Sequence, residues 1–353
     1  MNIVFVNACE NWAGIKTWMR EVAAFLDRKG HDVRIVCRDG DLFVQECKRL
    51  NLRCHPIQFG MDFSPQTIVW FWRLFRQAQT NIIVTNISKE IRTAGIAAKF
   101  LRIAHVNRLG NYGDLKPTMK NRLLYNGLVD RVFVPSQGLQ EHFAGFDFLR
   151  DKVCYFPNAV TPPPLNIQDN PCAKFAVVAH LSKRKQVDKI LLAFSHLQDL
   201  PWELHIGGNG PEFGTLREQA NRLGLAHRVC FLGEVNPTQF LQDKDVGLLF
   251  STQEGFPNVV VEYMAMSCAV IAADLPGTRE IIASDNEGIL IHHQDITALE
   301  QAIRGLIEHP QRRNALIRQG YEKVRTSFHQ EVIYPRIEQE FERIICQKRS
   351  GSL

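Results

Sequence analysis

Short apolar runs alternate along the chain with longer segments in which apolar residues recur at helical spacing. In the first half this pattern predicts both strands and helices. The strands are expected at Asn2 to Asn7, Asp32 to Cys37, Asn81 to Asn86, His105 to Leu109, Arg131 to Pro135 and Lys152 to Phe156, and the helices at Ile15 to Lys29, Asp41 to Leu50 and Pro65 to Gln79. Strands that alternate with helices of this length form a parallel sheet covered on both faces. The pattern therefore predicts a Rossmann-like first domain.

The same rhythm restarts after Asn158 to Cys172, a proline-containing segment whose composition is typical of an interdomain linker. Beyond it we expect strands at Lys174 to Ala179, Trp202 to Gly207, Val229 to Leu232, Asp245 to Phe250 and Ala269 to Ala273, and helices at Gln186 to Leu197, Pro211 to Leu223 and Asn258 to Ser267. The sequence thus predicts an α/β protein with Rossmann-like domains over residues 1–160 and 173–330. Ligands of such sheets bind outside the carboxyl ends of the strands, so a cleft between two facing domains is the expected site.

The last segment, residues 331–349, is expected to be helical. Its apolar side chains recur on one face, at Ile333, Ile337, Phe341, Ile344 and Ile345. A stripe of this kind packs on an apolar surface. We expect the helix to complete the first domain.

Composition agrees with this organisation and narrows the function. A chain of 353 residues is too long for one core and fits two domains. Its net charge of +5 is too small to indicate nucleic-acid binding, although it suits an anionic ligand or an acidic membrane surface. The nine cysteines contain no Cys-x-x-Cys pair, which favours free thiols over disulfides or a zinc site. The chain enters a strand without an apolar leader, and no apolar run reaches the about 18 residues that span a bilayer, so we expect a cytoplasmic protein.

The candidate chemistry is concentrated in one stretch, Glu254 to Glu262, which holds two carboxylates around a Gly-Phe-Pro-Asn turn. A predicted strand precedes it, and Pro257 and Asn258 signal the start of a helix. A loop that leads from a strand into a helix presents backbone N–H groups to a diphosphate. The carboxylates are then free to bind hydroxyls. Taken alone, the two glutamates also fit simple helix capping or solubility.

The order of motifs resembles the retaining GT-B glycosyltransferases of the large family 4 group. The Glu254-to-Glu262 stretch is similar to their E-x7-E motif. Three further elements follow the family's order, namely residues 207–212 (its G-D-G-P-E turn), 229–233 (its V-x-F-L-G strand) and 276–282 (its G-x-P-E-I element). The resemblance implies a GT-B fold that moves a hexose or similar sugar from a nucleotide sugar to an acceptor.

Two departures from the family pattern concern the diphosphate. Where the family has Gly-Arg-Leu, this chain has Ala179-His180-Leu181, and Lys185 matches the lysine that follows. A histidine is mostly neutral at pH 7 and lacks the fork of a guanidinium, so Arg184 or Lys183 would have to supply the missing charge. The glycine-rich first loop retains one glycine, Gly14, instead of two.

The resemblance also implies roles for individual residues. Lys185 would stabilise the leaving diphosphate, Glu254 would contact the donor sugar and Glu262 would bind the ribose hydroxyls. Donor-binding positions are expected at Gly14, His180, Arg184, Gly255, Phe256, Pro257, Asn258 and Val259, with Gly210, Phe231 and Leu232 lining the nucleobase pocket. His105 resembles a family histidine that faces the donor sugar. The alternative for Lys185 is an ordinary surface lysine, and the alternative for His105 is a packing role inside the domain.

The resemblance therefore implies a retaining glycosyltransferase that uses a UDP-sugar, with a GDP-sugar as the alternative, to build bacterial surface polysaccharide or lipopolysaccharide. The acceptor would be a saccharide or lipid-linked. The resemblance does not include the D-x-D metal motif of the other glycosyltransferase fold, and Asp39-Gly40-Asp41 is a coincidence in a turn, so we expect metal independence. A nonhydrolysing sugar-nucleotide epimerase and a non-catalytic nucleotide-sugar-binding protein are the competing hypotheses.

The aromatic segment Phe63 to Phe75 is expected to be a crossover helix on the sheet, and its contact with the inner membrane is left open.

Overall fold

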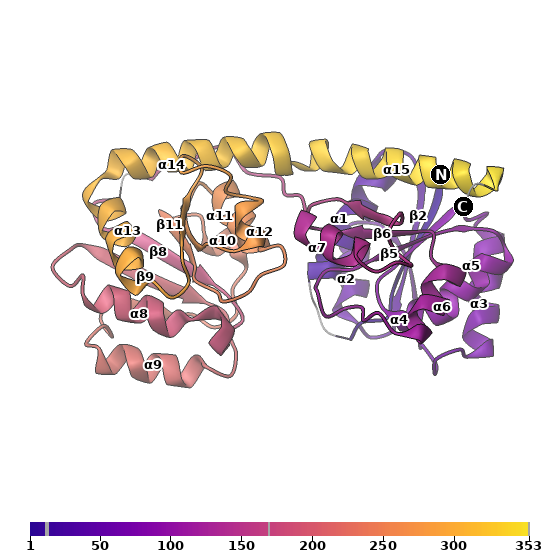
Figure 1. The fold of residues 1–353 in the computed structure, drawn as a ribbon, viewed down its shortest axis with the longest axis horizontal. Helices are drawn as coiled ribbons and strands as arrows, with labels where there is room; N and C mark the ends of the chain where they lie inside the picture. Colours follow the sequence, from indigo (N-terminus) through magenta and orange to yellow (C-terminus); the bar gives the residue numbers. More distant parts are fainter. Residues whose placement is uncertain (11–13, 169, 352–353) are drawn as a thin grey trace. The chain divides into compact units, whose positions relative to one another are not determined.

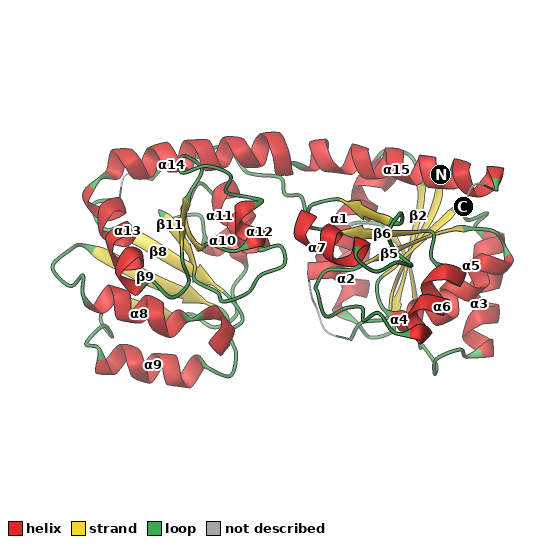
Figure 2. Cartoon of the chain, viewed as in Figure 1, coloured by secondary structure: helices red, strands yellow, loops and turns green. Residues whose placement is uncertain are grey.

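The structure is a computed structural model that describes residues 1–10, 14–168 and 170–351. The chain forms two compact units (Figure 1). Unit 1 comprises Met1–Ala159 and Ile333–Leu353, and unit 2 comprises Val160–Val332. Each unit is a parallel sheet with helices on both sides (Figure 2). This confirms an α/β protein of two Rossmann-like domains.

Unit 1 contains a seven-stranded sheet in the order β3-β2-β1-β4-β5-β6-β7. Its strands are β1 (Asn2–Asn7), β2 (Asp32–Arg38), β3 (Arg53–Ile57), β4 (Ile82–Thr85), β5 (Ala104–Arg108), β6 (Arg131–Val134) and β7 (Val153–Tyr155). Its helices are α1 (Gly14–Arg28), α2 (Leu42–Arg49), α3 (Pro65–Gln77), α4 (Ser88–Glu90), η1 (Ile91–Gly95), α5 (Ile96–Phe100), α6 (Met119–Leu128), α7 (Gln137–Ala144) and α15 (Gln330–Ser350). Alternation along each strand divides the core, so that Phe5 packs with α1 and α15 while Val4 packs with α3 and α5.

Helix α15 completes unit 1, as the apolar stripe predicts. Ile333, Ile337 and Phe341 are fully buried in the core that contains Phe5. The rings of Phe341 and Phe133 stack with centroids 5.7 Å apart. An ion pair of 2.6 Å between Lys348 Nζ and Asp130 Oδ1 fixes the end of the helix. Helix α15 therefore closes the first domain.

Unit 2 contains a six-stranded sheet in the order β10-β9-β8-β11-β12-β13. Its strands are β8 (Ala173–Val178), β9 (Trp202–Gly207), β10 (Val229–Phe231), β11 (Val246–Leu249), β12 (Ala269–Ala273) and β13 (Ile289–Ile291). Its helices are η2 (Lys183–Lys185), α8 (Val187–Ser195), α9 (Phe213–Arg222), α10 (Pro237–Phe240), α11 (Asn258–Ala265), α12 (Pro276–Arg279), α13 (Ile296–Glu308), α14 (Pro310–Lys323) and η3 (Val324–Phe328). Strand order reverses at β8, which lies between β9 and β11, so the switch point of this sheet is at the β8–β11 pair.

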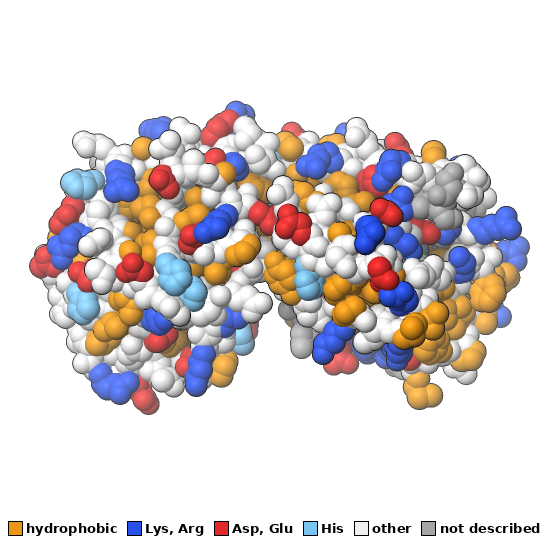
Figure 3. All heavy atoms as spheres, viewed as in Figure 1, with side chains coloured by type: hydrophobic (Ala, Val, Ile, Leu, Met, Phe, Trp, Pro, Cys, Tyr) orange, Lys and Arg blue, Asp and Glu red, His pale blue; other side chains and the backbone are white. Residues whose placement is uncertain are grey.

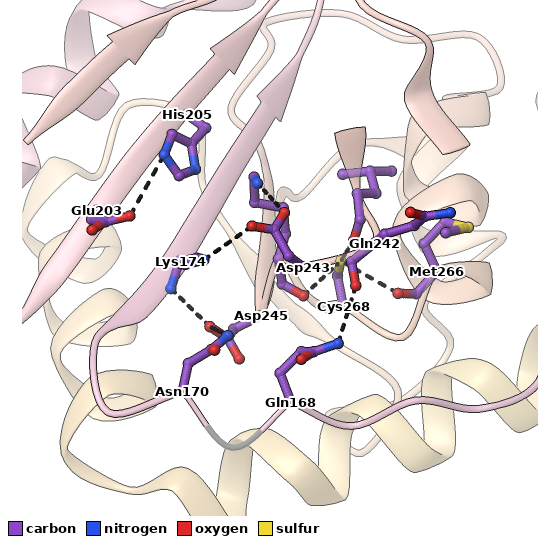
Figure 4. Close-up of polar contacts among 12 residues, drawn as sticks. Gln168, Asn170, Lys174, Glu203, His205, Gln242, Asp243, Asp245, Met266 and Cys268 are labelled. Atoms are coloured by element: carbon purple, nitrogen blue, oxygen red, sulfur yellow. Dashed lines mark hydrogen bonds and ion pairs between the residues drawn. The ribbon is translucent and has the colours of Figure 1, made fainter. Parts of the chain in front are cut away.

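Most of the expected linker, Asn158 to Cys172, is part of unit 2. Figure 4 shows the Gln168 amide donating to the Gln242 carbonyl at 3.1 Å and the Asn170 amide donating to Asp245 at 2.9 Å. Asp245 Oδ2 also accepts the backbone N–H of Lys174 at 2.8 Å. These bonds hold the segment against the amino ends of β8 and β11. The chain passes from unit 1 to unit 2 between Ala159 and Val160 and returns to unit 1 between Val332 and Ile333.

Candidate active site

The loops that follow β8 and β11 meet at the switch point of unit 2. Lys185 is the last residue of η2 in the first loop, and Glu254 lies in the second. Lys185 Nζ donates to Glu254 Oε1 at 2.6 Å. Both side chains are mostly buried, with 13% and 10% of their surfaces exposed. Residues separated by 69 positions in the sequence are thus brought together where ligands of such sheets bind.

Arg184 makes a second set of contacts between these loops. Its guanidinium lies 3.3 Å from Glu254 Oε1 and donates to the Gln253 carbonyl, while its own carbonyl accepts the N–H of Thr252 at 2.9 Å. Glu254 is therefore held between two cations. Lys185 and Arg184 outnumber Glu254 in this pair of loops, which suits a ligand with two negative phosphates.

Two glycines allow the turn after β9 to pack directly on the turn after β8. A Cβ atom at Gly208 would lie 1.8 Å from the Ala179 carbonyl oxygen, and one at Gly210 would lie 2.3 Å from that of Leu181. Their φ angles of +132° and +156° are also rare for other residues. Leu181 N–H donates to the Asn209 carbonyl at 2.8 Å, which holds the two turns together. Gly210 thus has a demonstrable backbone role beside the candidate site.

Helix α11 is fixed beneath the site by a tyrosine that sequence reasoning missed. Tyr263 is fully buried, its hydroxyl accepts the Val178 N–H at 2.8 Å, and its ring lies over Gly247, where a Cβ atom would be 2.1 Å away. Burial raises the pKa of the Tyr263 hydroxyl well above its usual range, so it remains protonated. Val178 ends β8 and Gly247 lies in β11. The tyrosine therefore aligns the helix that carries Glu262 with the switch point.

The Gly-Phe-Pro-Asn turn is covered by the element that begins at Pro276. A Cβ atom at Gly277 would lie 2.4 Å from the Gly255 carbonyl, so the two segments are in backbone contact. Phe256 and Pro257 are buried, and Phe256 packs against Phe328 with ring centroids 6.0 Å apart. Pro257 is the N-cap of α11, and Asn258 and Val259 open it. The turn is thus a rigid entry to α11.

The other predicted donor-binding residues of unit 2 are more dispersed. His180 is exposed just beyond β8. Leu232, beyond the end of β10, is 53% exposed. Phe231 packs on Phe213 at 5.8 Å and lines a pocket of about 350 Å³ between α9 and β10. Gly210 and Leu232 do not line that pocket.

In unit 1, Gly14 is the exposed first residue of α1, and Trp12 and Ala13 of the same motif lie outside the described residues. Lys16, in the first turn of α1, links the loop after β1 to the loop after β2. Its ammonium group is fully buried, pairs with Asp41 and donates to the Glu10 carbonyl at 3.3 Å. Lys16 therefore anchors the start of α1 to the start of α2.

His105 lies inside unit 1, with 1% of its surface exposed. Its Nδ1–H donates to the Leu128 carbonyl, and its Nε2 accepts the Thr85 hydroxyl at 2.8 Å. Burial lowers the pKa of His105 to about 4, so the ring is neutral. Asn107 extends the network by donating to Thr85 Oγ1 at 3.0 Å. This placement favours the packing role over contact with a donor sugar.

Sequence reasoning also missed two buried ionisable groups at the carboxyl ends of β4 and β5. Glu90 accepts N–H groups from Ala8 at 2.6 Å and Asn86 at 2.5 Å, and burial raises its pKa to about 7. Arg108 is 3% exposed, lies 3.9 Å above the Trp18 ring and donates to Asn158, yet its Nη1 has no hydrogen-bond acceptor among the described residues. Burial lowers the pKa of Arg108 to about 9. Neither type of residue stands out in a sequence, because the burial that makes it unusual depends on the fold.

Comparisons with known proteins show similarity to glycosyltransferases along most of the chain. Residues 166–323 match the model of the family Glycosyl transferases group 1, and residues 12–162 match that of Glycosyltransferase Family 4. An exopolysaccharide phosphotransferase of Streptomyces coelicolor is 27% identical over 347 residues, which are 93% of this chain and 36% of that protein. The lipopolysaccharide core biosynthesis glycosyltransferase LpsD of Rhizobium meliloti is 26% identical over 74% of this chain and 75% of its own length. The chain thus spans about a third of the first relative and three quarters of the second.

Among solved structures, HepE of Anabaena in complex with UDP-glucose superposes with a TM-score of 0.82 at 18% identity, covering 97% of this chain and 99% of that one. At this identity the likeness concerns the fold. Within the part of the chain that the structure describes, no helix is long and apolar enough to cross a membrane.

Proposed function

The chain belongs to the GT-B glycosyltransferases of the group 1 family, and from this premise we propose that it transfers a sugar from a nucleoside diphosphate sugar to a saccharide or lipid-linked acceptor. The observation that carries the proposal is the Lys185–Glu254 pair at the switch point of unit 2. A uridine nucleotide is favoured because a structural neighbour is named as a complex with UDP-glucose. A role in surface polysaccharide or lipopolysaccharide synthesis is supported by the name of the Rhizobium meliloti relative.

In this proposal the ion pair rearranges when the donor binds. Lys185 Nζ, which donates to Glu254 Oε1 at 2.6 Å, transfers its hydrogen bond to the leaving diphosphate. Glu254 then accepts hydroxyls of the donor sugar, and Arg184, 3.3 Å away, holds the carboxylate in place. Glu262 on α11 accepts the ribose hydroxyls. The two carboxylates therefore position the donor, and the lysine stabilises the charge that develops as the bond breaks.

The bond between the anomeric carbon and the diphosphate oxygen breaks, and its electrons leave with the diphosphate. We propose retention by attack on the same face, in which the acceptor oxygen bonds to the anomeric carbon and the departing phosphate oxygen takes the acceptor proton. Lys185 and Arg184 supply cationic charge at the leaving group, so we also propose that the reaction needs no metal ion. Persistence of turnover in a chelator supports this, and activity restored only by manganese contradicts it.

The site of action proposed here is the cytoplasmic side of the membrane that carries the acceptor. The decisive experiment is calorimetry with UDP and GDP, followed by assays of UDP-sugar turnover with and without acceptors. Saturable binding of UDP that depends on Glu262, together with acceptor-dependent release of UDP, supports the transferase. Formation of an epimer of the sugar nucleotide without an acceptor favours the epimerase, and binding without turnover favours a non-catalytic protein.

A further inference from the structure

The positive charge of this protein is concentrated in one part of unit 1. Residues 61–128 contain ten Lys or Arg and three Asp or Glu, whereas the remaining residues contain 32 and 34, respectively. This segment is therefore net +7 and the rest of the chain net −2, although the whole chain has a modest +5. Of these charged side chains, Glu90 and Arg108 are buried, so the surplus of seven cations remains among the others, and Asp62 pairs with Arg92. Little acidic charge remains to neutralise the surface.

Large exposed apolar side chains are concentrated in the same segment. They are Met61 at 85%, Phe63 at 51%, Val69 at 46%, Trp72 at 36%, Ile87 at 37%, Phe100 at 77%, Met119 at 69% and Leu123 at 68%. Single exposed apolar residues are ordinary, but a group of them marks an interaction surface. Figure 3 shows apolar and basic side chains gathered over the part of unit 1 where α3, α5 and α6 lie in Figure 1.

Helix α3 shows how this surface is built. Phe71, Leu74 and Phe75 bury one side of the helix against the sheet, which confirms the crossover helix expected from the sequence. The opposite side presents Val69, Trp72, Arg73 and Arg76. The Arg76 guanidinium lies 4.7 Å from the centroid of the Trp72 ring. The indole ring and the guanidinium therefore lie side by side on the exposed side of the helix.

Neighbouring elements extend the surface. Helix α5, which contacts α3, ends in exposed Lys99 and Phe100, and Arg102 follows. Before α3, Phe63 has a φ of +61°, a conformation that is costly for a bulky residue, and it leaves the ring half exposed beside Arg92. We define the basic apolar face as Met61, Trp72, Arg73, Arg76, Lys99, Phe100 and Arg102.

We propose that the basic apolar face docks on the surface of a bilayer that contains anionic lipid. Basic heads bind anionic lipid headgroups, and the apolar side chains enter the boundary with the acyl chains. A second copy of the chain would bring the same positive charge to this face and be repelled. A nucleic acid would match the charge but leave Met61 and Phe100 without a partner. The proposal deepens the proposed function by indicating how the enzyme reaches a lipid-linked acceptor.

The test is sedimentation of the full chain with vesicles of phosphatidylcholine, with or without phosphatidylglycerol, in the absence of donor and acceptor. We expect binding to the anionic vesicles alone, weakened by added salt because exposed charges are screened. In the charge variant, Arg73→Gln, Arg76→Gln, Lys99→Gln and Arg102→Gln are combined. Since each basic residue near an anionic surface contributes roughly a fivefold factor, the partition coefficient should fall at least about a hundredfold.

A matched control removes four exposed arginines of unit 2, namely Arg222, Arg312, Arg318 and Arg325, by the same change to Gln. It should retain most of the binding. The apolar variant Met61→Ser with Phe100→Ser should lower the partition coefficient by about tenfold or more, because two exposed apolar side chains no longer enter the bilayer. All variants should bind UDP as the wild type does, which separates this proposal from that of the transferase.

Three results overturn the docking proposal. These are no binding of the wild type to anionic vesicles, equal losses in the charge variant and its control, or full binding by the apolar variant. A dimer of the wild type that the apolar variant abolishes assigns the face to self-association instead. If the wild type does not bind UDP, the proposed function is contradicted. Its binding to vesicles is then a separate result.

Discussion

Lys185 Nζ and Glu254 Oε1 are joined by a 2.6 Å ion pair between the loops that follow β8 and β11. The pair links the two central strands of unit 2 at the point where strand order reverses. It satisfies a mostly buried carboxylate and a mostly buried ammonium at once. A ligand that accepts the hydrogen bond of Lys185 removes it from Glu254. The Glu254 carboxylate must then be satisfied by Arg184 or by hydroxyl groups of the ligand. In the proposed function the pair therefore couples diphosphate binding to sugar binding.

Lys185→Ala should lower turnover of the nucleotide sugar at least tenfold, equivalent to about 1.4 kcal/mol of transition-state stabilisation. The reason is that Lys185 lies inside the pair of loops whereas Lys183, in the same turn, is exposed. Lys183→Ala is the matched control and should change turnover by less than about threefold. Steady-state kinetics with each purified variant measure both values. Equal effects of the two changes on turnover would show that Lys185 does not stabilise the leaving diphosphate.

Gly208→Ala should destabilise unit 2 by about 2 kcal/mol or more, because a Cβ atom there meets the Ala179 carbonyl at 1.8 Å and the φ of +132° is strained for alanine. Gly214→Ala, in α9, is the control, since a Cβ atom there meets nothing within 4 Å. It should leave stability unchanged or raised, because alanine favours helix. Urea unfolding of both variants tests the difference. A Gly208→Ala protein as stable as the wild type contradicts the close approach of the two turns.

Much of this fold could be predicted from the sequence, because apolar runs and helical spacing mark buried strands and the helices between them. β1, α1 and α15 lie where the pattern places them. β3 and the helical segment from α4 to α5 are not evident in that pattern. β3 is an edge strand with partly exposed residues, so it lacks a continuous apolar run. The helices α6, α7, α13 and α14 were likewise not among the expected elements.

The candidate site was predictable to a smaller extent. The motif around Glu254 and the spacing to Lys185 could be read directly, but the ion pair between them could not, because it depends on two loops that meet through sheet order. Tyr263 and Arg108 were missed for the same reason, since their partners lie far away in the sequence. The excess of basic residues in residues 61–128 can be counted in the sequence. The net charge of +5 for the whole chain does not reveal it.

Glu90 and His105 should give the folded protein two pH dependences of opposite sign. The pKa of Glu90 rises from its usual 4.5 to about 7, so the stability it contributes is present below pH 4.5 and is lost as the pH rises to 7. The pKa of His105 falls from 6.5 to about 4, so its contribution is present above pH 6.5 and is lost as the pH falls to 4. Each change amounts to about 3 kcal/mol at 1.36 kcal/mol per pKa unit.

Between about pH 4.5 and 6.5 the two contributions should nearly cancel in the wild type. In Glu90→Gln only the histidine contribution remains, and the free energy of unfolding should rise with pH. In His105→Gln only the glutamate contribution remains, and the same free energy should fall with pH. Urea unfolding across this range measures the slopes. Slopes of the same sign in both variants contradict the opposed shifts, whatever the absolute stability of either protein.

Arg108 and Arg313 are both 3% exposed, but only Arg313 lies near a buried carboxylate, with its Nη2 3.9 Å from Asp245 Oδ1. Arg108→Met should therefore raise the free energy of unfolding by about 1 kcal/mol or leave it unchanged, because it removes a buried charge that no carboxylate in the described residues offsets. Arg313→Met should lower it by about 3 kcal/mol, because it leaves Asp245 buried without its cation. Urea unfolding at neutral pH compares the pair under identical conditions. A loss in Arg108→Met as large as that in Arg313→Met shows that the indole ring and Asn158 stabilise the Arg108 charge as well as a carboxylate would.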